Sequence, residues 1–289
     1  MKPASFRYVV ARSLAQALAV KAEHGDAARF LAGGQSLVPT MNFRLAQPAV
    51  LIDINRLDDL AGITGEAGVT RIGALTRYRA LERDAAIARD QPLLREALPL
   101  IAHPQIRNRG TIGGNLAHAD PASELPAVML ALGARLHAQS VRGERWIDAL
   151  AFFRGALTTA LAADEMLVEI ELPVRPRHAT CFIEVARRRG DFALIGVAAA
   201  VAFAADGSCA QARLAYCGAA DTPVCAGEAA ARLIGGRLDD AAIHDSATLA
   251  REELDPPGNL HASKSYQRQL IGVLTRRALE TARTRWTAS

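Results

Sequence analysis

Two stretches, Leu31-Ala-Gly-Gly-Gln-Ser-Leu-Val-Pro39 and Arg109-Gly-Thr-Ile-Gly-Gly-Asn115, carry the strongest structural signal in this chain. Each offers residues with little or no side chain, together with hydroxyl or amide groups. Glycine lets backbone N–H groups come close to a ligand and adopts turns that other residues resist. Consecutive N–H groups form concave sites for anions, phosphates in particular. Two such segments predict a diphosphate held from two sides, and therefore a dinucleotide cofactor.

Neither stretch fits the common phosphate motifs. A P-loop has a Lys-Ser/Thr pair after its last glycine, and none follows Gly34 or Gly114. A Rossmann fingerprint needs a third glycine and a long helix, whereas Pro39 soon interrupts the first stretch. Asp53 does stand at the distance where that fold places its ribose-binding acid. The alternative for either stretch alone is a glycine turn without a ligand.

Composition sets the broad class of the protein. The chain has 289 residues, of which 50% are hydrophobic and 22% charged, enough for two or three cores. No apolar run reaches the length of a membrane span, and the first eight residues lack a signal-peptide core, so we expect a cytoplasmic protein. The net charge of +4 is scattered along the chain, which argues against nucleic-acid binding.

Cysteine spacing bears on metal binding. The chain has four cysteines, and none forms a C-x-x-C pair: Cys181, Cys209, Cys217 and Cys225. Zinc and iron–sulfur sites usually take close cysteine pairs. We therefore expect no metal or cluster on this chain, and buried free thiols instead.

Local patterns predict a mixture of helices and strands without regular β-α-β alternation, which indicates the α+β class. Ser13 to Gln16 resembles a capping box, and Gly25 a helix end. Further helices are expected at 78–81, 92–101, 122–132, 148–153 and from Tyr266 to Ala278. Strands are expected at 29–32, 50–54, 69–73, 166–172, 181–185, 194–203 and 209–216. Asp206-Gly207 predicts a hairpin, 173–177 reads as a linker, and the alanine-rich 196–205 also allows a helix.

The two glycine stretches resemble the FAD signatures of the medium, flavin-binding subunit of molybdenum hydroxylases, the group of xanthine dehydrogenase and aerobic carbon monoxide dehydrogenase. The resemblance runs in order along nearly the whole chain, through His103–Gly110, His118–Pro126, Phe152–Gly155 with Thr158-Thr159, Asp164–Ile170 and Arg187–Phe192. It implies a two-part PCMH-type FAD-binding domain, residues 1–57 and 58–175. A C-terminal α+β domain of antiparallel strands and helices would follow at 176–289.

The resemblance also implies which residues contact FAD. In the first stretch these are Ala32, Gly33, Gly34, Gln35, Ser36 and Leu37. Around the second they are Ala102, His103, Gly110, Thr111, Gly114, Asn115 and Ala117. Beyond it they are Asp120, Ser123, Glu124, Asp191 and Phe192. The glycines would bring N–H groups to the diphosphate, while Gln35 and Ser36 would donate to phosphate or ribityl oxygens.

Other polar residues allow two interpretations. Arg107 and Arg109 would neutralise the diphosphate, or else be solvated or face a partner. His118 with Asp120 and Glu124 suggests a metal site, but Pro121 breaks any shared helix face and we expect none. Asp120 or Ser123 would otherwise cap the next helix. The turn at 187–192 is either a solvated basic turn or, by the resemblance, a cover over one face of the flavin ring.

The resemblance implies an electron-transfer subunit rather than a chain with its own catalytic residues. A large molybdopterin subunit would hydroxylate the substrate, a small subunit with [2Fe-2S] clusters would relay electrons, and FAD on this chain would pass them to an external acceptor. The complex would be a dimer of heterotrimers. The substrate stays open among carbon monoxide, purines, pyridines and aldehydes, and the acceptor among NAD, a quinone and oxygen. The alternatives are a stand-alone FAD-dependent oxidase or a flavin-free docking subunit.

Overall fold

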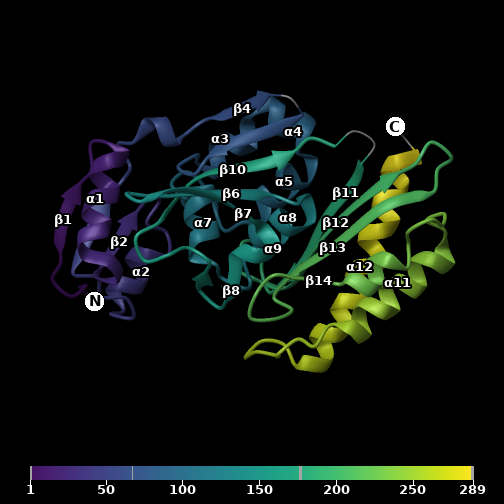
Figure 1. Ribbon diagram of the computed structural model, residues 1–289. Helices are drawn as coiled ribbons and strands as arrows, with labels where there is room; N and C mark the ends of the chain where they lie inside the picture. Colours follow the sequence, from purple (N-terminus) through teal and green to yellow (C-terminus); the bar gives the residue numbers. More distant parts are fainter. Residues whose placement is uncertain (1, 67, 176–177, 288–289) are drawn as a thin grey trace.

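The computed structural model describes residues 2–66, 68–175 and 178–287. In this part of the chain the strands form three sheets and one two-stranded ribbon. The sheets follow one another along the chain and across the molecule, from the purple N-terminal unit to the yellow C-terminal helix (Figure 1). The fold is α+β, as the sequence predicts.

The first sheet is small and parallel, in the order β1-β3-β2: β1 (Arg7–Val10), β2 (Ala28–Leu31) and β3 (Val50–Asp53). Helix α1 (Leu14–His24) connects β1 to β2. Its N-terminus is capped as predicted, because the Ser13 hydroxyl accepts a hydrogen bond from the N–H of Gln16 at 3.2 Å. Gly25 terminates the helix. After β2 the chain runs through the first glycine segment into the short α2 (Leu37–Asn42), so no long helix begins there.

The second sheet is antiparallel, in the order β4-β5-β10-β6-β7: β4 (Ile63–Glu66), β5 (Val69–Gly73), β6 (Arg135–Ser140), β7 (Gly143–Asp148) and β10 (Met166–Pro173). Helices cover it: α3 (Tyr78–Arg83), α4 (Ala85–Asp90), α5 (Pro92–Ala97), α6 (Pro104–Arg107), α7 (Ile112–His118), α8 (Glu124–Leu132) and α9 (Ala149–Phe152). The ribbon joins β8 (Phe153–Gly155) to β9 (Thr158–Thr159). The β6–β7 hairpin was missed from sequence, because its turn lacks the usual Asn-Gly or Asp-Gly pair.

The third sheet, β11-β12-β13-β14, has helices on both faces: β11 (His178–Ala186), β12 (Ala193–Phe203), β13 (Cys209–Cys217) and β14 (Val224–Cys225). Ala198 of β12 joins the core around α8, while Val197 and Ala199 join the core under α12 (Lys264–Thr287). Two-sided burial explains the alanines, since small side chains let both helix layers approach. The alanine-rich segment, for which a helix was the alternative, is therefore part of strand β12. The predicted hairpin turn at Asp206-Gly207 is confirmed. Helices α10 (Gly227–Ala231) and α11 (Asp240–Glu253) complete this end.

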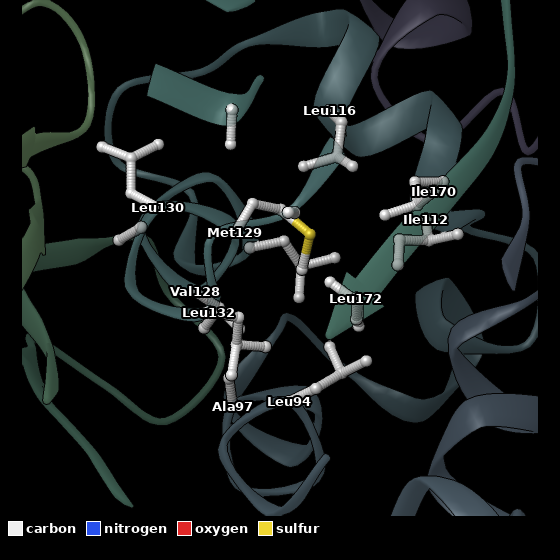
Figure 2. Close-up of a cluster of buried hydrophobic side chains, with 14 of the residues drawn as sticks. Leu94, Ala97, Ile112, Leu116, Val128, Met129, Leu130, Leu132, Ile170 and Leu172 are labelled. Atoms are coloured by element: carbon white, nitrogen blue, oxygen red, sulfur yellow. The ribbon is translucent and has the colours of Figure 1, made fainter. Parts of the chain in front are cut away.

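Helix α8 is the centre of the largest core. All nine of its residues are buried, and it packs against α5, α7 and the third sheet. Figure 2 shows its apolar side chains meeting those of α5, α7 and β10. This core also includes Phe182 and Cys217 of the third sheet. The second and third sheets, with their helices, therefore share one continuous core. Among the helices of the described residues, none is long and apolar enough to cross a membrane.

The second glycine stretch is not a loop throughout. The sequence pattern predicts a glycine-rich loop there, but residues 112–118 form helix α7. Its cap is Thr111, whose hydroxyl accepts the N–H of Gly114 at 3.2 Å. The predicted linker begins inside β10, and its residues 176–177 lie outside the described residues.

Candidate flavin-binding site

The first glycine segment offers unused backbone donors. Within the described part of the chain, no hydrogen bond uses the N–H groups of Gly33, Gly34, Gln35 or Ser36. Gly34 has a φ of +72°, a conformation that favours glycine and makes successive N–H groups point to one side. The Gln35 side chain donates to the carbonyl of Gly33 at 2.8 Å, which steadies the turn. This geometry is suited to binding an anion.

The second segment has no row of unused donors of this kind. The first four N–H groups of α7 already donate hydrogen bonds inside the protein, to acceptors in residues 74–76 and in Thr111. Gly114 and Ala117 are exposed, and Asn115 is half-buried. The surface that this segment presents to a ligand therefore consists of side chains and Cα groups rather than free backbone amides.

The two segments touch through their backbones. A Cβ atom built on Gly33 would lie 2.5 Å from the carbonyl oxygen of Arg109 and 2.9 Å from the Cα of Gly110. One built on Gly114 would lie 3.8 Å from the Cβ of Ala32. Only a residue without a side chain fits at Gly33, so this glycine is required for the close approach of the two segments. We call the two adjoining segments the cradle. Its unused N–H groups and its glycine backbone are suited to binding the diphosphate of a dinucleotide.

Behind the second segment lies a network of polar side chains. The Asn115 amide donates to the Ser123 hydroxyl at 2.8 Å and accepts from it at 3.0 Å, and it also bonds the buried hydroxyl of Tyr78. Ser123 precedes α8, but its hydroxyl is hydrogen-bonded to Asn115 and does not cap the helix. The Asp120 carboxylate accepts the N–H of Ala122 at 2.9 Å, so it shapes the turn before α8.

Two buried carboxyl groups adjoin this network. Glu124 is only 3% exposed, and burial raises its pKa to about 8, with the nearby carboxylate of Glu184 contributing. Burial likewise raises the pKa of Glu184 to about 7, and its Oε2 atom has no hydrogen-bond partner among the described residues. The thiol of Cys217 is fully buried near both carboxyls, which helps to raise its pKa. Titratable groups with perturbed pKa values beside a polar site are typical of functional sites.

The turn between β11 and β12 meets the predicted Ala102–His103 segment. A Cβ built on Gly190 would lie 2.8 Å from the Ala102 carbonyl and 2.9 Å from the His103 ring. Ala102 itself has a φ of +46°, unusual for a residue with a side chain. In the turn, Asp191 pairs with Arg187 at 3.3 Å, and Phe192 is 60% exposed. The structure thus packs Gly190, which precedes Asp191 and Phe192 in this turn, against Ala102 and His103.

Several polar residues have structural partners. Arg107 is buried, pairs with Glu82 at 2.7 Å and donates to the carbonyls of Ile101 and Ala102 at 3.0 Å each. A diphosphate role for Arg107 is therefore wrong. Asp53 is bonded by Asn55 and the Tyr8 hydroxyl, which leaves it unavailable as a Rossmann ribose ligand.

Among the described residues, no group of three or more His, Cys, Asp or Glu side chains is arranged to hold a metal ion. The four cysteines are free thiols, three of them buried.

The sequence patterns did not predict Asn55 and Arg77. Asn55 donates to the Ala32 carbonyl of the first glycine segment, and Arg77 donates to the Arg109 carbonyl of the second. The patterns did not predict Glu184 either. The local sequence of these three residues contains no motif; the only available signal is that Asn55 directly follows a predicted strand end beside Asp53.

Comparison with known proteins identifies the family. The family model described as "FAD binding domain in molybdopterin dehydrogenase" matches residues 4–175, and that for the "CO dehydrogenase flavoprotein C-terminal domain" matches residues 180–282. The chain belongs to the FAD-binding subunits of the molybdenum hydroxylases. It is an oxidoreductase subunit whose cofactor is FAD, as the resemblance of its glycine segments implies.

Individual members of this family resemble the chain over its full length. It is 43% identical to the 6-hydroxypseudooxynicotine dehydrogenase complex subunit alpha of Paenarthrobacter nicotinovorans, over 98% of this chain and 96% of the relative. It is 40% identical to the caffeine dehydrogenase subunit beta of Pseudomonas sp. (strain CBB1), over 98% and 96% of the two chains. The structure of a carbon monoxide dehydrogenase from Hydrogenophaga pseudoflava superposes with a TM-score of 0.96 at 36% identity, covering 99% of each chain. The names of these proteins refer to different compounds: 6-hydroxypseudooxynicotine, caffeine and carbon monoxide.

Proposed function

We propose that this chain is the electron-transfer subunit of a molybdenum hydroxylase, receiving electrons from a [2Fe-2S] subunit and passing them to an external acceptor. The observation that carries the proposal is the row of four unused N–H groups from Gly33 to Ser36, held against the second glycine segment. This arrangement offers an anchor for the diphosphate of FAD, and bound FAD would supply the redox chemistry.

The remaining predicted contacts divide along the cofactor. Ala32 to Leu37 would form the phosphate end with Gly110, Thr111, Gly114, Asn115 and Ala117. The ring end would be formed by Ala102, His103, Asp120, Ser123, Glu124, Asp191 and Phe192. In this assignment Glu124 and Glu184 would hold or release protons near the ring, since their pKa values are raised into the neutral range.

The names of the relatives support a multi-subunit complex. Relatives at 40–43% identity are named as dehydrogenase subunits, one of them of a dehydrogenase complex, which supports assembly with other chains. We propose a large molybdopterin subunit and a small [2Fe-2S] subunit as these partners, in a dimer of heterotrimers located in the cytoplasm. The division at residues 57 and 175 into two FAD-binding parts and a C-terminal domain belongs to the same proposal.

Purification of the chain with and without its partners tests the proposal. The isolated protein is expected to be yellow and to release FAD, not FMN, on denaturation. A colourless protein that fails to bind added FAD would favour a flavin-free docking subunit. Iron and molybdenum should co-purify with the assembled complex, and electrons from its substrate should reduce the flavin. Flavin reduction by a substrate in the isolated chain would instead favour a stand-alone oxidase.

A further inference from the structure

Asn55 connects the end of β3 to the first glycine segment. Its side-chain amide donates to the carbonyl of Ala32 at 2.9 Å and to that of Leu31 at 3.1 Å. The same amide and the Asn55 backbone N–H bond the carboxylate of Asp53, at 2.7 and 2.9 Å. Asn55 therefore fixes the position of the chain where it enters the glycine segment.

Arg77 connects Asn55 to the second glycine segment. Its Nη2 donates to the Asn55 side-chain oxygen at 2.6 Å, and its Nη1 donates to the carbonyl of Arg109. Arg77 also forms an isolated β-bridge with Thr111, the cap of α7. Partial burial and the nearby Arg109 lower the pKa of Arg77, an arrangement that costs free energy and is offset by these hydrogen bonds.

The Arg109 carbonyl lies between Arg77 and Gly33. It accepts the hydrogen bond from Arg77, and it is also the atom that a Cβ on Gly33 would meet at 2.5 Å. The connections thus form a closed circuit: Ala32 to Asn55, Asn55 to Arg77, Arg77 to Arg109, and Arg109 back to Gly33. A circuit of hydrogen bonds closed by a backbone contact restricts how far the two segments can separate.

We propose that Asn55 and Arg77 are positioning residues that hold the two glycine segments at the separation required for a diphosphate. The inference rests on the proposed function, because it assumes that FAD binds in the cradle. Each terminal nitrogen of Arg77 already donates to a protein acceptor, and these two bonds fix the position of the side chain between the segments. The test below separates this positioning role from a direct charge effect on phosphate. Pre-organisation of this kind raises affinity by reducing the ordering that the ligand must induce.

The test measures FAD and ADP affinity of the deflavinated full chain at low and high salt. The variants are Asn55→Ala, Arg77→Gln, Arg77→Lys and the double variant Asn55→Ala/Arg77→Gln. Arg83→Gln is the matched control. Arg83 is exposed on α3, the helix that Arg77 precedes, and this substitution removes the same positive charge as Arg77→Gln. Melting temperature without flavin, and the spectrum and midpoint potential with saturating FAD, are recorded for each.

The expected loss of affinity for FAD and ADP is roughly tenfold in each single variant, the size of one lost charge-assisted hydrogen bond. The double variant should be little worse than either single one, because both residues belong to one circuit. Asn55→Ala should show the parent's salt dependence, and the flavin spectrum and potential should not change. Arg77→Lys should not restore affinity, since one ammonium group cannot bond both acceptors in this geometry.

Four results would overturn the proposal. They are parent-like affinity in Asn55→Ala, full recovery in Arg77→Lys, additive losses in the double variant, or an equal loss in Arg83→Gln. Recovery in Arg77→Lys with a changed salt slope in Arg77→Gln would show a direct charge effect on phosphate. If Arg77→Gln does not fold, Asn55→Ala and Arg77→Lys decide alone. Absence of FAD binding by the parent would refute the proposed function itself, and so is distinguishable from these outcomes.

Discussion

The two glycine segments have similar composition but opposite hydrogen-bond states. From Gly33 to Ser36 the backbone N–H groups are unused within the described chain, whereas the first four N–H groups of α7 are all occupied. The first segment is therefore suited to donate to a ligand, and the second to supply side chains and a packing surface. Similar glycine content thus gives no indication by itself of which segment offers its backbone.

The same contrast extends to the two ends of the proposed cofactor site. The phosphate end is built from backbone in contact with backbone, with no room for a Cβ at Gly33. The 187–192 turn at the other end is mostly exposed and held by the Arg187–Asp191 ion pair. We therefore expect substitutions at the first to change binding and stability, and substitutions at the second to change reactivity.

Gly33→Val should have the largest effect. Its side chain would meet the Arg109 carbonyl and push the two segments apart, at a cost of about 3 kcal/mol in the free energy of unfolding. The glycine pattern alone predicts loss of FAD with the fold largely kept. The contact with Arg109 predicts loss of FAD together with this loss of stability. Thermal melting and flavin content measure it, with Gly65→Val as control, where no atom lies within 4 Å of the added Cβ. Full flavin occupancy in Gly33→Val would show that FAD binding does not depend on the close approach of Gly33 to Arg109.

Glu124→Gln tests the side-chain network behind the second segment through pH. The pKa of Glu124 is about 8 in the folded protein, compared with 4.5 for an ordinary glutamate in the unfolded chain. Between these two pH values the carboxyl is protonated in the folded state and ionised in the unfolded state. Stability should therefore fall as pH rises through this window, by up to about 1.4 kcal/mol per pH unit.

Urea unfolding between pH 5 and 9 measures this dependence. Glu124→Gln should abolish the slope between pH 7 and 8, while Glu184, with a pKa of about 7, still contributes at lower pH. Glu66→Gln, on exposed strand β4, is the control. A parent-like slope between pH 7 and 8 in Glu124→Gln would show that another group is responsible.

Gly114→Ala should have a smaller effect than Gly33→Val. The added Cβ would lie 2.6 Å from the Thr111 hydroxyl and disturb the cap of α7, at about 1 kcal/mol. Because the N–H groups here are already used, FAD affinity should fall only as far as the cap is disturbed. Thr111→Ala should then give a similar loss of stability. A much larger loss of FAD affinity in Gly114→Ala than in Thr111→Ala would indicate direct contact of Gly114 with the cofactor.

Phe192→Ala and Asp191→Ala should have the smallest effect on binding. Phe192 is 60% exposed, and loss of a stacking contact with the flavin ring would cost roughly 1 kcal/mol at most. We expect FAD to stay bound while the flavin midpoint potential and the rate of reoxidation by oxygen or a quinone change. If both variants match the parent in potential and reoxidation, the turn is only a solvated loop.

Local sequence signals predicted much of the architecture. Ser13 and Gly25 marked the ends of α1, Asp206-Gly207 marked a hairpin, and alternating or continuous apolar runs marked most of the buried strands. These features depend on a few neighbouring residues, whose backbone preferences act without the rest of the chain. The family resemblance added the cofactor and the likeness of both domains to known flavoproteins.

The sequence by itself determined where several turns and helix caps lie, and its two glycine segments predicted a dinucleotide cofactor. Tertiary structure decided much of which segment keeps free amides, because the acceptors for the N–H groups of Ile112 and Gly113 are the carbonyls of Thr76 and Ala74, far away in the chain. It decided that Arg107 pairs with Glu82 and that Asn55 and Arg77 join the segments. It also raised the pKa of Glu124, because the fold buries that carboxyl near Glu184 of the third sheet. Hydrogen-bond partners and burial are properties of the folded neighbourhood, and no local pattern encodes them.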